Sequence, residues 1–313
     1  MLAGVLLAAL LLTSCSPAQT MKRLRFGVAG EGGVYHVFGE AFATLENETD
    51  NGTVELKTTA GSAANLRLLM GEYLQLAIAQ ADLAQDASNQ TGIFEEEEVE
   101  RGFSAVAALY AEACQVIVRA DSEIQSVEDL QGKTVSIGAE ESGSEQNALQ
   151  ILSAYGLNDK LVDTVNLNYE DAAAQLKAGK IDAIFITAGT PSPVVTELAG
   201  ACEIRLLRVD GTAAQRLTQA YSAYQTITIP AGTYPGQEED VQTVGVKAVL
   251  LASDELPAKQ VQQLTELLFA NKEGLEEKLG LTLDTEAEAV EGVGIPFHAG
   301  AVAYYKAAGI TVE

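Results

Sequence analysis

The sequence contains no tryptophan, two histidines and three cysteines among its 313 residues. Metal and redox centres usually draw on several His and Cys side chains, so we expect no metal and no cofactor. Basic residues are also few, because 19 Lys and Arg stand against 44 Asp and Glu, which gives a net charge of −25 at pH 7. This balance argues against nucleic acid as a partner, since phosphate is bound mainly by Lys and Arg.

A single long apolar run occupies residues 2–12, and it is too short to span a bilayer as a helix. The run ends in Leu12-Thr13-Ser14-Cys15, which resembles the lipobox of bacterial lipoproteins. That resemblance implies a signal peptide over residues 1–15, lipidation of Cys15 and a short tether over residues 16–21. The mature protein would then be extracytoplasmic and lipid-anchored to the outer face of the bacterial cytoplasmic membrane.

One observation leaves the leader open to another interpretation. Its first residues carry no Lys or Arg, although a secretory signal normally begins with positive charge. The true start codon therefore stays undecided from this sequence, and a buried helix with a chance cysteine is the alternative.

Apolar residues make up 47% of the chain, enough to bury one large core or two mid-sized ones. Strand patterns alternate with helix patterns, which predicts an α/β fold with largely parallel sheets. The predicted strands are 24–29, 54–58, 75–80, 134–138 and 181–186. The predicted helices are 35–45, 62–71, 142–155 and 171–178.

Residues 65–82 and 171–187 repeat one order of features: a helix, a turn with glycine and charge, a buried strand and a polar residue at the strand's end. Two similar α/β lobes would produce this echo. Ligands of open α/β sheets bind beyond the carboxyl ends of the strands, so we expect the site there.

Four polar turns, at residues 30–35, 61–65, 142–145 and 187–193, follow predicted strands and precede predicted helices. Unpaired N–H groups and partial positive charge at helix N-termini favour anions, so converging turns suit a small carboxylate. The first turn fails the dinucleotide fingerprint, because Tyr35 occupies the place of the third glycine. In the third, Ser142 and Glu145 form a capping-box pattern that would leave the Ser144 hydroxyl free for a ligand.

The structural alternative for each turn is an ordinary tight turn or a helix cap, with Ser62 as a suitable N-cap. No nucleophile elbow, zinc-binding helix or phosphate loop is present in the sequence, so we expect no enzyme activity. Cys114 and Cys202 could pair outside the cell, but spacing alone does not decide whether they do.

Taken in order, several segments resemble the TAXI family, the solute receptors of tripartite ATP-independent periplasmic (TRAP) transporters. The resemblance spans roughly residues 24–310. The segments are residues 30–35, 61–69, 79–82, 126–138, 142–145, 181–189, 234–237 and 296–298, with Gly300, Tyr304 and Tyr305.

The resemblance implies a two-lobe periplasmic-binding-protein fold of type II with the cleft between its lobes. Lobe 1 would comprise residues 22–112 and about 245–313, and lobe 2 about 113–244. The family captures a small organic acid or amino acid, typically glutamate, glutamine or a 2-oxoglutarate-like ligand, and delivers it to a TRAP-type permease without catalysis. We expect a monomer. The implied ligand contacts are Gly33, Tyr35, Ser62, Asn65, Gln80, Ser142, Ser144 and Thr187, with Tyr234 as a weaker candidate.

The sequence departs from the family pattern at Glu31 and at Glu140-Glu141. If those carboxylates face the cleft, they favour a ligand that carries an amino group over a simple dicarboxylate. Two other functions remain as alternatives: a receptor of the same fold for an ATP-driven importer or sensor, and an exported α/β enzyme.

Overall fold

The computed structural model describes residues 23–49, 52–97 and 102–312. The predicted signal peptide, the predicted lipidation site Cys15 and the predicted tether lie outside the described residues. None of the helices within them is long and apolar enough to cross a membrane. Cys114 and Cys202, whose pairing the sequence left open, are both free thiols.

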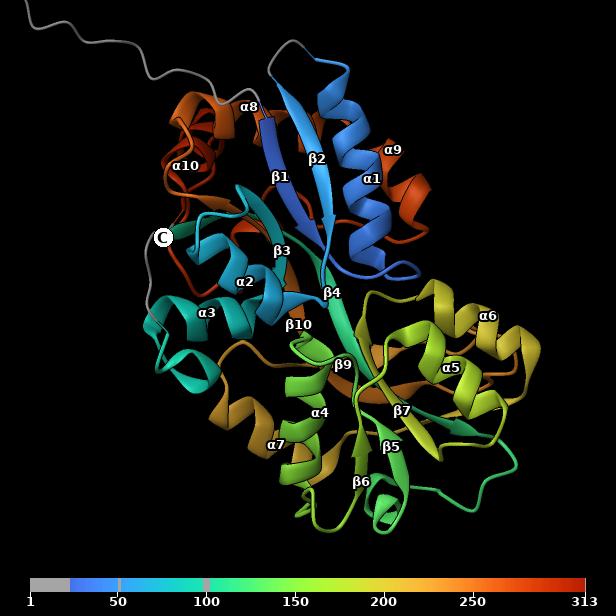
Figure 1. Cartoon of the computed structure of the whole chain (residues 1–313). Helices are drawn as coiled ribbons and strands as arrows, with labels where there is room; N and C mark the ends of the chain where they lie inside the picture. The colour runs from blue at the N-terminus through green and yellow to red at the C-terminus, as the bar shows by residue number, and fades with distance from the viewer. Residues whose placement is uncertain (1–22, 50–51, 98–101, 313) are drawn as a thin grey trace, which may run out of the picture.

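The elements alternate along most of the chain, as the sequence predicts (Figure 1). The strands are β1 (Arg23–Val28), β2 (Thr53–Thr58), β3 (Leu76–Gln80), β4 (Phe103–Arg119), β5 (Thr134–Ser136), β6 (Asp163–Val165), β7 (Ala183–Ala188), β8 (Ile204–Leu207), β9 (Gln225–Ile229) and β10 (Val241–Ser253). The α-helices are α1 (Val34–Asn47), α2 (Ser62–Met70), α3 (Ala81–Asn89), α4 (Gly143–Ala154), α5 (Tyr169–Lys177), α6 (Pro193–Ala201), α7 (Gly211–Ala220), α8 (Ala258–Ala270), α9 (Lys272–Leu279) and α10 (Ala299–Ala307).

All these strands belong to one continuous sheet in the order β2-β1-β3-β10-β4-β7-β5-β6, with β8 paired to β4 and β9 to β10. The expectation of a largely parallel sheet is wrong. Within the described chain, β1 pairs in parallel with β2 and β3, and β5 with β6 and β7, whereas β4 and β10 are antiparallel to every strand with which they pair. Parallel strands are joined through crossover helices, whereas the connections that lead into β4 and β10 reverse the direction of the chain.

Buried side chains gather into cores on either side of the middle of the sheet. Two clusters draw on residues up to Tyr110 and from Ala248 onward, around β1, β3 and the helices α1, α2 and α8. Two others draw on residues from Ala113 to Val246, around β7 and the helices α4, α5 and α6. We refer to these halves as the first and second lobe. They support the predicted boundaries near residues 112 and 245, which remain a prediction.

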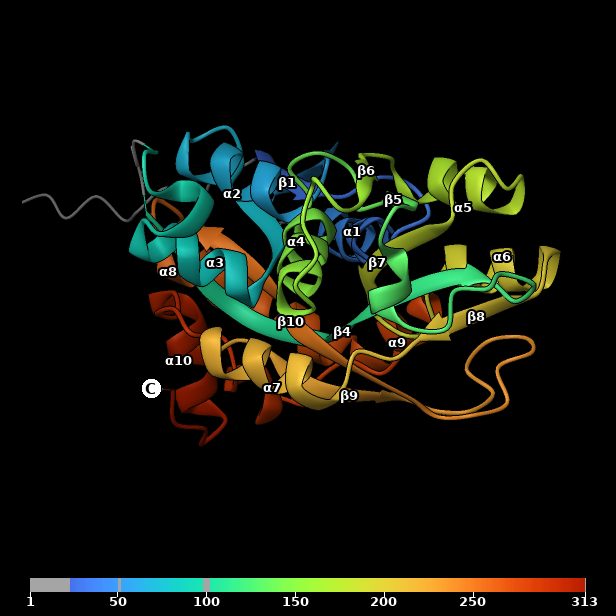
Figure 2. The same cartoon turned by 90° about the horizontal axis from the view of Figure 1, so that it is seen from below.

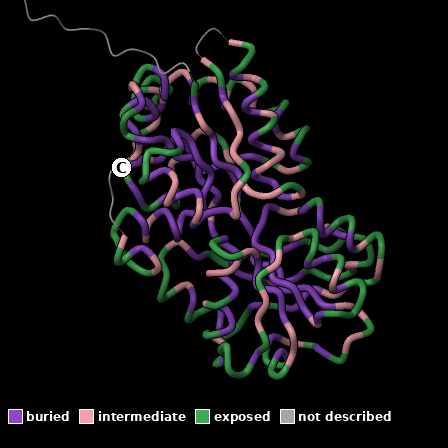
Figure 3. Tube along the Cα trace, in the orientation of Figure 1, coloured by how far each residue is buried: buried purple, intermediate pink, exposed green. Residues whose placement is uncertain are grey.

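The two longest strands, β4 and β10, run through both lobes (Figure 2). They pair with each other from Phe103–Ser253 to Ala113–Gly245, and beyond that point each pairs with strands of the second lobe. Buried residues follow the strands, whereas exposed residues lie on the outer helices and loops (Figure 3). The central strands therefore connect the lobes and form the floor on which the site is built.

Candidate functional site

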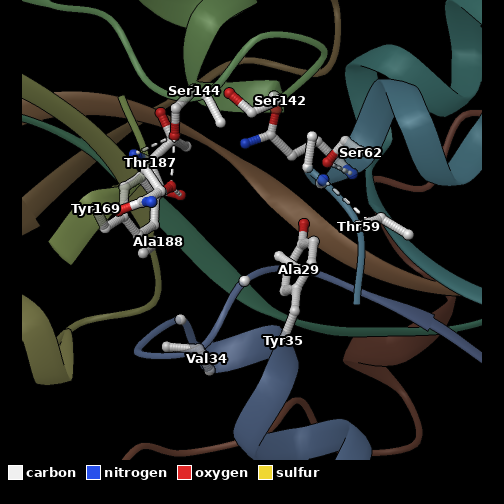
Figure 4. Close-up of a pocket in the computed structure, with 18 of the residues that line it drawn as sticks. Ala29, Val34, Tyr35, Thr59, Ser62, Ser142, Ser144, Tyr169, Thr187 and Ala188 are labelled. Carbon is white, nitrogen blue, oxygen red and sulfur yellow. Dashed lines mark hydrogen bonds between the residues drawn. The ribbon is translucent and has the colours of Figure 1, made fainter. Parts of the chain in front are cut away.

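A cavity of about 270 Å³ lies between the lobes, at the carboxyl ends of β1, β2, β3 and β7 (Figure 4). This is the edge at which the sequence places the site. The lining residues are Ala29, Gly30, Glu31, Gly33, Val34, Tyr35, Thr59, Ala60, Gly61, Ser62, Gln80, Glu112, Ala139, Ser142, Gly143, Ser144, Asn168, Tyr169, Thr187 and Ala188.

Five helices begin at this cavity. Their N-cap residues all line it: Gly33 for α1, Gly61 for α2, Gln80 for α3, Ser142 for α4 and Asn168 for α5. Each helix start presents N–H groups without intrahelical partners and a partial positive charge. No Lys or Arg is among the described lining residues, so an anion here would be held by backbone dipoles instead of a basic side chain.

In the first lobe, Tyr35 and Glu112 form a buried pair, in which the Tyr35 hydroxyl donates to Glu112 Oε2 at 2.7 Å. Burial raises the pKa of the Glu112 carboxyl to about 8, and the nearby Asp82 carboxylate adds to the rise, while hydrogen bonds from Tyr35 and Gln80 lower it in part. Glu112 is therefore mostly protonated at pH 7. Burial likewise raises the pKa of the Tyr35 hydroxyl well above its ordinary value.

Gln80 ends β3 and lies against the other lobe. Its backbone N–H donates to Ser62 Oγ at 3.1 Å, so Ser62 fixes the strand end and does not cap α2 as the sequence suggests. Gly61 is the cap instead, and its φ of 129° is one that glycine adopts readily. The side-chain amide of Gln80 covers Gly143, where an added Cβ would lie 2.0 Å from Gln80 Oε1.

In the second lobe, the Ser144 hydroxyl is already bonded within the protein. It accepts from the Thr187 N–H at 2.9 Å and lies 2.5 Å from the Tyr169 hydroxyl, which itself donates to the Thr187 carbonyl at 2.9 Å. The expectation that this hydroxyl is free for a ligand is wrong. The reason is the proximity of β7 and α5, which sequence spacing does not reveal.

The predicted capping box of α4 forms only in half. Ser142 Oγ accepts from the Glu145 N–H at 3.1 Å, as expected of an N-cap. The Glu145 carboxylate does not return to Ser142 but accepts from the Glu141 N–H at 2.8 Å. Ser142 thus remains at the cavity wall with its oxygen engaged in capping.

Seven of the nine ligand contacts expected from the sequence line the cavity. These are Gly33, Tyr35, Ser62, Gln80, Ser142, Ser144 and Thr187. Asn65 and Tyr234 are not in the lining. Asn65 donates to the Ile78 carbonyl at 2.8 Å and ties α2 to β3, while the Tyr234 hydroxyl donates to Gln115 Oε1 at 2.7 Å.

Several lining residues were absent from the sequence-based prediction, notably Thr59, Glu112, Asn168 and Tyr169. Asn168 carries a readable signal, because Asn three residues before Asp171 suits an N-cap, and its Oδ1 accepts from the Asp171 N–H at 2.8 Å. Glu112 is an acid within an apolar run, which is itself unusual in a buried strand.

The acidic residues at the departures from the TAXI pattern have different positions. Glu31 lines the cavity, whereas Glu140 and Glu141 do not. Glu141 instead joins the lobes, because its carboxylate pairs with Arg67 at 3.1 Å and its carbonyl accepts from the Ala64 N–H at 3.2 Å.

With this geometry in place, the chain can be compared with known proteins. A family model described as the NMT1-like family matches residues 26–309. The chain belongs to the NMT1-like family. The match does not single out the TAXI receptors that the sequence motifs resemble.

Solved structures of periplasmic binding proteins share the fold. PhnD1 from Prochlorococcus marinus, in complex with methylphosphonate, is 11% identical with a TM-score of 0.57 over 84% of this chain and 91% of that one. A binding protein component of an ABC phosphonate transporter from Pseudomonas aeruginosa is 13% identical, with a TM-score of 0.52 over 84% and 80%. The alkanesulfonate-binding protein SsuA from Xanthomonas axonopodis, bound to MOPS, is 18% identical, with a TM-score of 0.52 over 84% and 80%. The predicted two-lobe α/β fold is confirmed.

Beside the cavity, a second buried acid joins the lobes. Asp82 Oδ2 of α3 accepts from Asn147 Nδ2 of α4 at 3.0 Å, and Asn147 Nδ2 also donates to the Tyr224 hydroxyl at 2.7 Å. Asp82 Oδ1 and Asn147 Oδ1 are both buried and have no partner among the described residues. A protonated Asp82 could donate to such an acceptor, whereas the carboxylate cannot.

This arrangement makes stability depend on pH. Burial raises the pKa of Asp82 from its ordinary 3.8 to about 6, so its protonated form stabilises the folded state below about pH 4 and that contribution is lost as the pH rises through about 6. We expect Asp82→Asn, which resembles the protonated acid, to raise the unfolding free energy relative to wild type by about 2–3 kcal/mol more at pH 8 than at pH 4. Urea unfolding at several pH values measures this.

The exposed Asp121 provides the matched control, and Asp121→Asn should change the unfolding free energy little across the same pH range. A stability difference between Asp82→Asn and wild type that does not vary with pH would contradict the assignment.

Proposed function

We propose that this chain is an extracytoplasmic solute-binding protein that captures a small carboxylate or amino acid, of the glutamate, glutamine or 2-oxoglutarate kind, and delivers it to a membrane transporter. The observation that carries the proposal is the cavity between the lobes, onto which five helix N-termini converge. A cavity of about 270 Å³ lies near the lower end of the usual range for ligand pockets, which favours a small solute.

Capture would rest on the backbone of both lobes. Helix starts at Gly33 and Gly61 belong to the first lobe, and those at Ser142 and Asn168 to the second. A ligand carboxylate that accepts N–H groups from both lobes holds them together, and each such charge-assisted hydrogen bond contributes roughly 1.5–3 kcal/mol. The net charge of −25 slows the encounter with an anion, while the local donors decide its binding.

A binding role is favoured over an enzymatic one. Two of the solved structures compared above are described as binding proteins, one for alkanesulfonates and one as a component of an ABC phosphonate transporter, and the third, PhnD1, is in complex with methylphosphonate. The Ser144 hydroxyl in the cavity lining is bonded to Tyr169 and Thr187 and not to a base.

For the transporter, we favour an ATP-driven importer. The protein from Pseudomonas aeruginosa that shares this fold is described as a component of an ABC transporter. The second candidate is a TRAP-type permease, which the motif resemblance to the TAXI family supports.

Ligand binding is the first test. Small molecules released from the denatured protein should include an organic acid, and that acid at 100 times its Kd should raise the unfolding free energy of the ligand-free protein by about 2.7 kcal/mol.

Gly143→Ala should weaken binding at least tenfold, because a Cβ there would collide with Gln80 Oε1 when the lobes are together.

The control is Gly274→Ala on the exposed face of α9, where an added Cβ meets nothing within 4 Å. Its affinity should equal that of wild type. If no small molecule is released and no organic acid stabilises the protein, the proposed function is wrong.

The energy source of transport separates the two transporter classes. With an ATP-driven importer, uptake of the identified ligand by cells should persist when an ionophore collapses the ion gradients and stop when ATP is depleted. Loss of uptake with ionophore alone, at unchanged ATP, would assign the chain to a TRAP-type permease.

We further propose that Cys15 anchors the protein to the membrane through a lipid, on the basis of the lipobox at residues 12–15. Cys15→Ala removes the thiol that would be lipidated, so the variant should stay unprocessed or leave the membrane fraction. Fractionation of cells expressing each form measures this, and identical behaviour of the two would contradict the anchor.

A further inference from the structure

One side of the cavity carries an acceptor that lacks a donor. Gln80 is 2% exposed, and its Oε1 is buried with no hydrogen-bond partner in the described part of the chain. A hydrogen bond from the Gln80 side chain lowers the pKa of Glu112 in part, and a carboxylate accepts only from the amide N–H, so the Gln80 oxygen is left unused. A buried acceptor without a donor costs free energy, so this position favours a ligand that brings an N–H or O–H group.

Beside the Gln80 side chain is an acid without a counter-ion. Glu112 is 2% exposed and lines the same cavity, where the described lining holds no basic side chain. The titratable groups that interact with it are Tyr35 on α1, Asp82 on α3, Tyr110 and Cys114 on β4, and Tyr169 on α5. Each of them is neutral or negative, so only the ligand or a proton can supply positive charge.

We propose that Glu112 and Gln80 form the subsite for a ligand ammonium group, so that the cavity takes a zwitterion, with its carboxylate at the other helix starts and its ammonium group beside these two side chains. The inference rests on the proposed function and specifies its ligand class. An ammonium group has three N–H donors, enough for Gln80 Oε1 and for the Glu112 carboxylate together.

Binding is then coupled to a proton. Burial raises the pKa of Glu112 to about 8 in the empty cavity. A ligand ammonium group beside the carboxylate favours its charged form, so Glu112 gives its proton to the solvent as the ligand enters. The ligand ammonium group thus replaces the proton as the positive charge on Glu112, so the carboxylate is neutralised both with and without ligand. A ligand with a second carboxylate in place of the ammonium group would instead keep Glu112 protonated and release nothing.

The test begins with the ligand released from the denatured protein, which should react with an amine-directed reagent such as dansyl chloride. Calorimetric titration then compares L-glutamate with glutarate, which has the same two carboxylates and lacks the amino group. We expect L-glutamate to bind about a hundredfold more tightly than glutarate. Titrations in buffers of different ionisation enthalpy should show release of close to one proton at pH 7 and little at pH 9.

Two variants assign the effect to its residue. Glu112→Gln should abolish the proton release and the preference for L-glutamate over glutarate. Glu46→Gln is the matched control, because Glu46 is an acid of 1% exposure whose carboxyl lies outside the cavity lining. It should leave both the preference and the proton release unchanged.

The outcomes separate this inference from the proposed function. A released ligand without an amine, glutarate binding as tight as that of L-glutamate, or proton release that survives Glu112→Gln would overturn the subsite and leave a solute-binding protein. If no released ligand is found and neither probe binds, the subsite and the proposed function both fall.

Discussion

The fold depends on one antiparallel pair of strands, β4 and β10, which belongs to both lobes. Where the pair leaves the first lobe, Gly245 faces Ala113, and an added Cβ at Gly245 would lie 2.1 Å from the Glu112 carbonyl. The close approach therefore requires glycine. The ladder also shifts register at Ala248/Val249 and Leu250/Leu251, and such irregularities bend a strand. Because Glu112 is on this pair, the position of the site and the relation of the lobes are set by the same strands.

The electrostatic character of the cavity follows from that arrangement. The parallel strands of each lobe end where β4 and β10 pass from one lobe into the other. The helices that follow these strands therefore begin there and direct their positive ends into one space. The same space contains the buried acid Glu112, and Asp82 lies close behind it. A site that combines positive helix ends with a buried acid suits a ligand with both charges better than a ligand with one.

Local sequence signals predicted the elements that have clear ends. Glycines and capping residues bound β1, α1, α2 and α4, and these appear close to the expected ranges. No comparable signal marks β4, whose 17 residues include five alanines and no glycine or proline, and alanine favours helices. Glu112 was missed with its strand. The roles of Ser62 and Ser144 were also beyond sequence reasoning, because their partners Gln80 and Thr187 are brought to them only by tertiary packing.

The contacts between the lobes bear on how the proposed solute-binding protein would release its ligand. The buried members of each core cluster belong to a single lobe. The lobes meet mainly through polar pairs: Asp82 with Asn147, Gln85 with Ser222, and Arg67 with Glu141. Water can replace each of these partners, so each contributes about 1 kcal/mol or less to holding the lobes together, except where burial leaves an acceptor unpaired. Under the proposed function, contacts of that size would leave the balance between open and closed lobes to the ligand, whose few charge-assisted hydrogen bonds would exceed them. An apolar interface between the lobes in place of these polar pairs would hold the cavity closed with or without a solute.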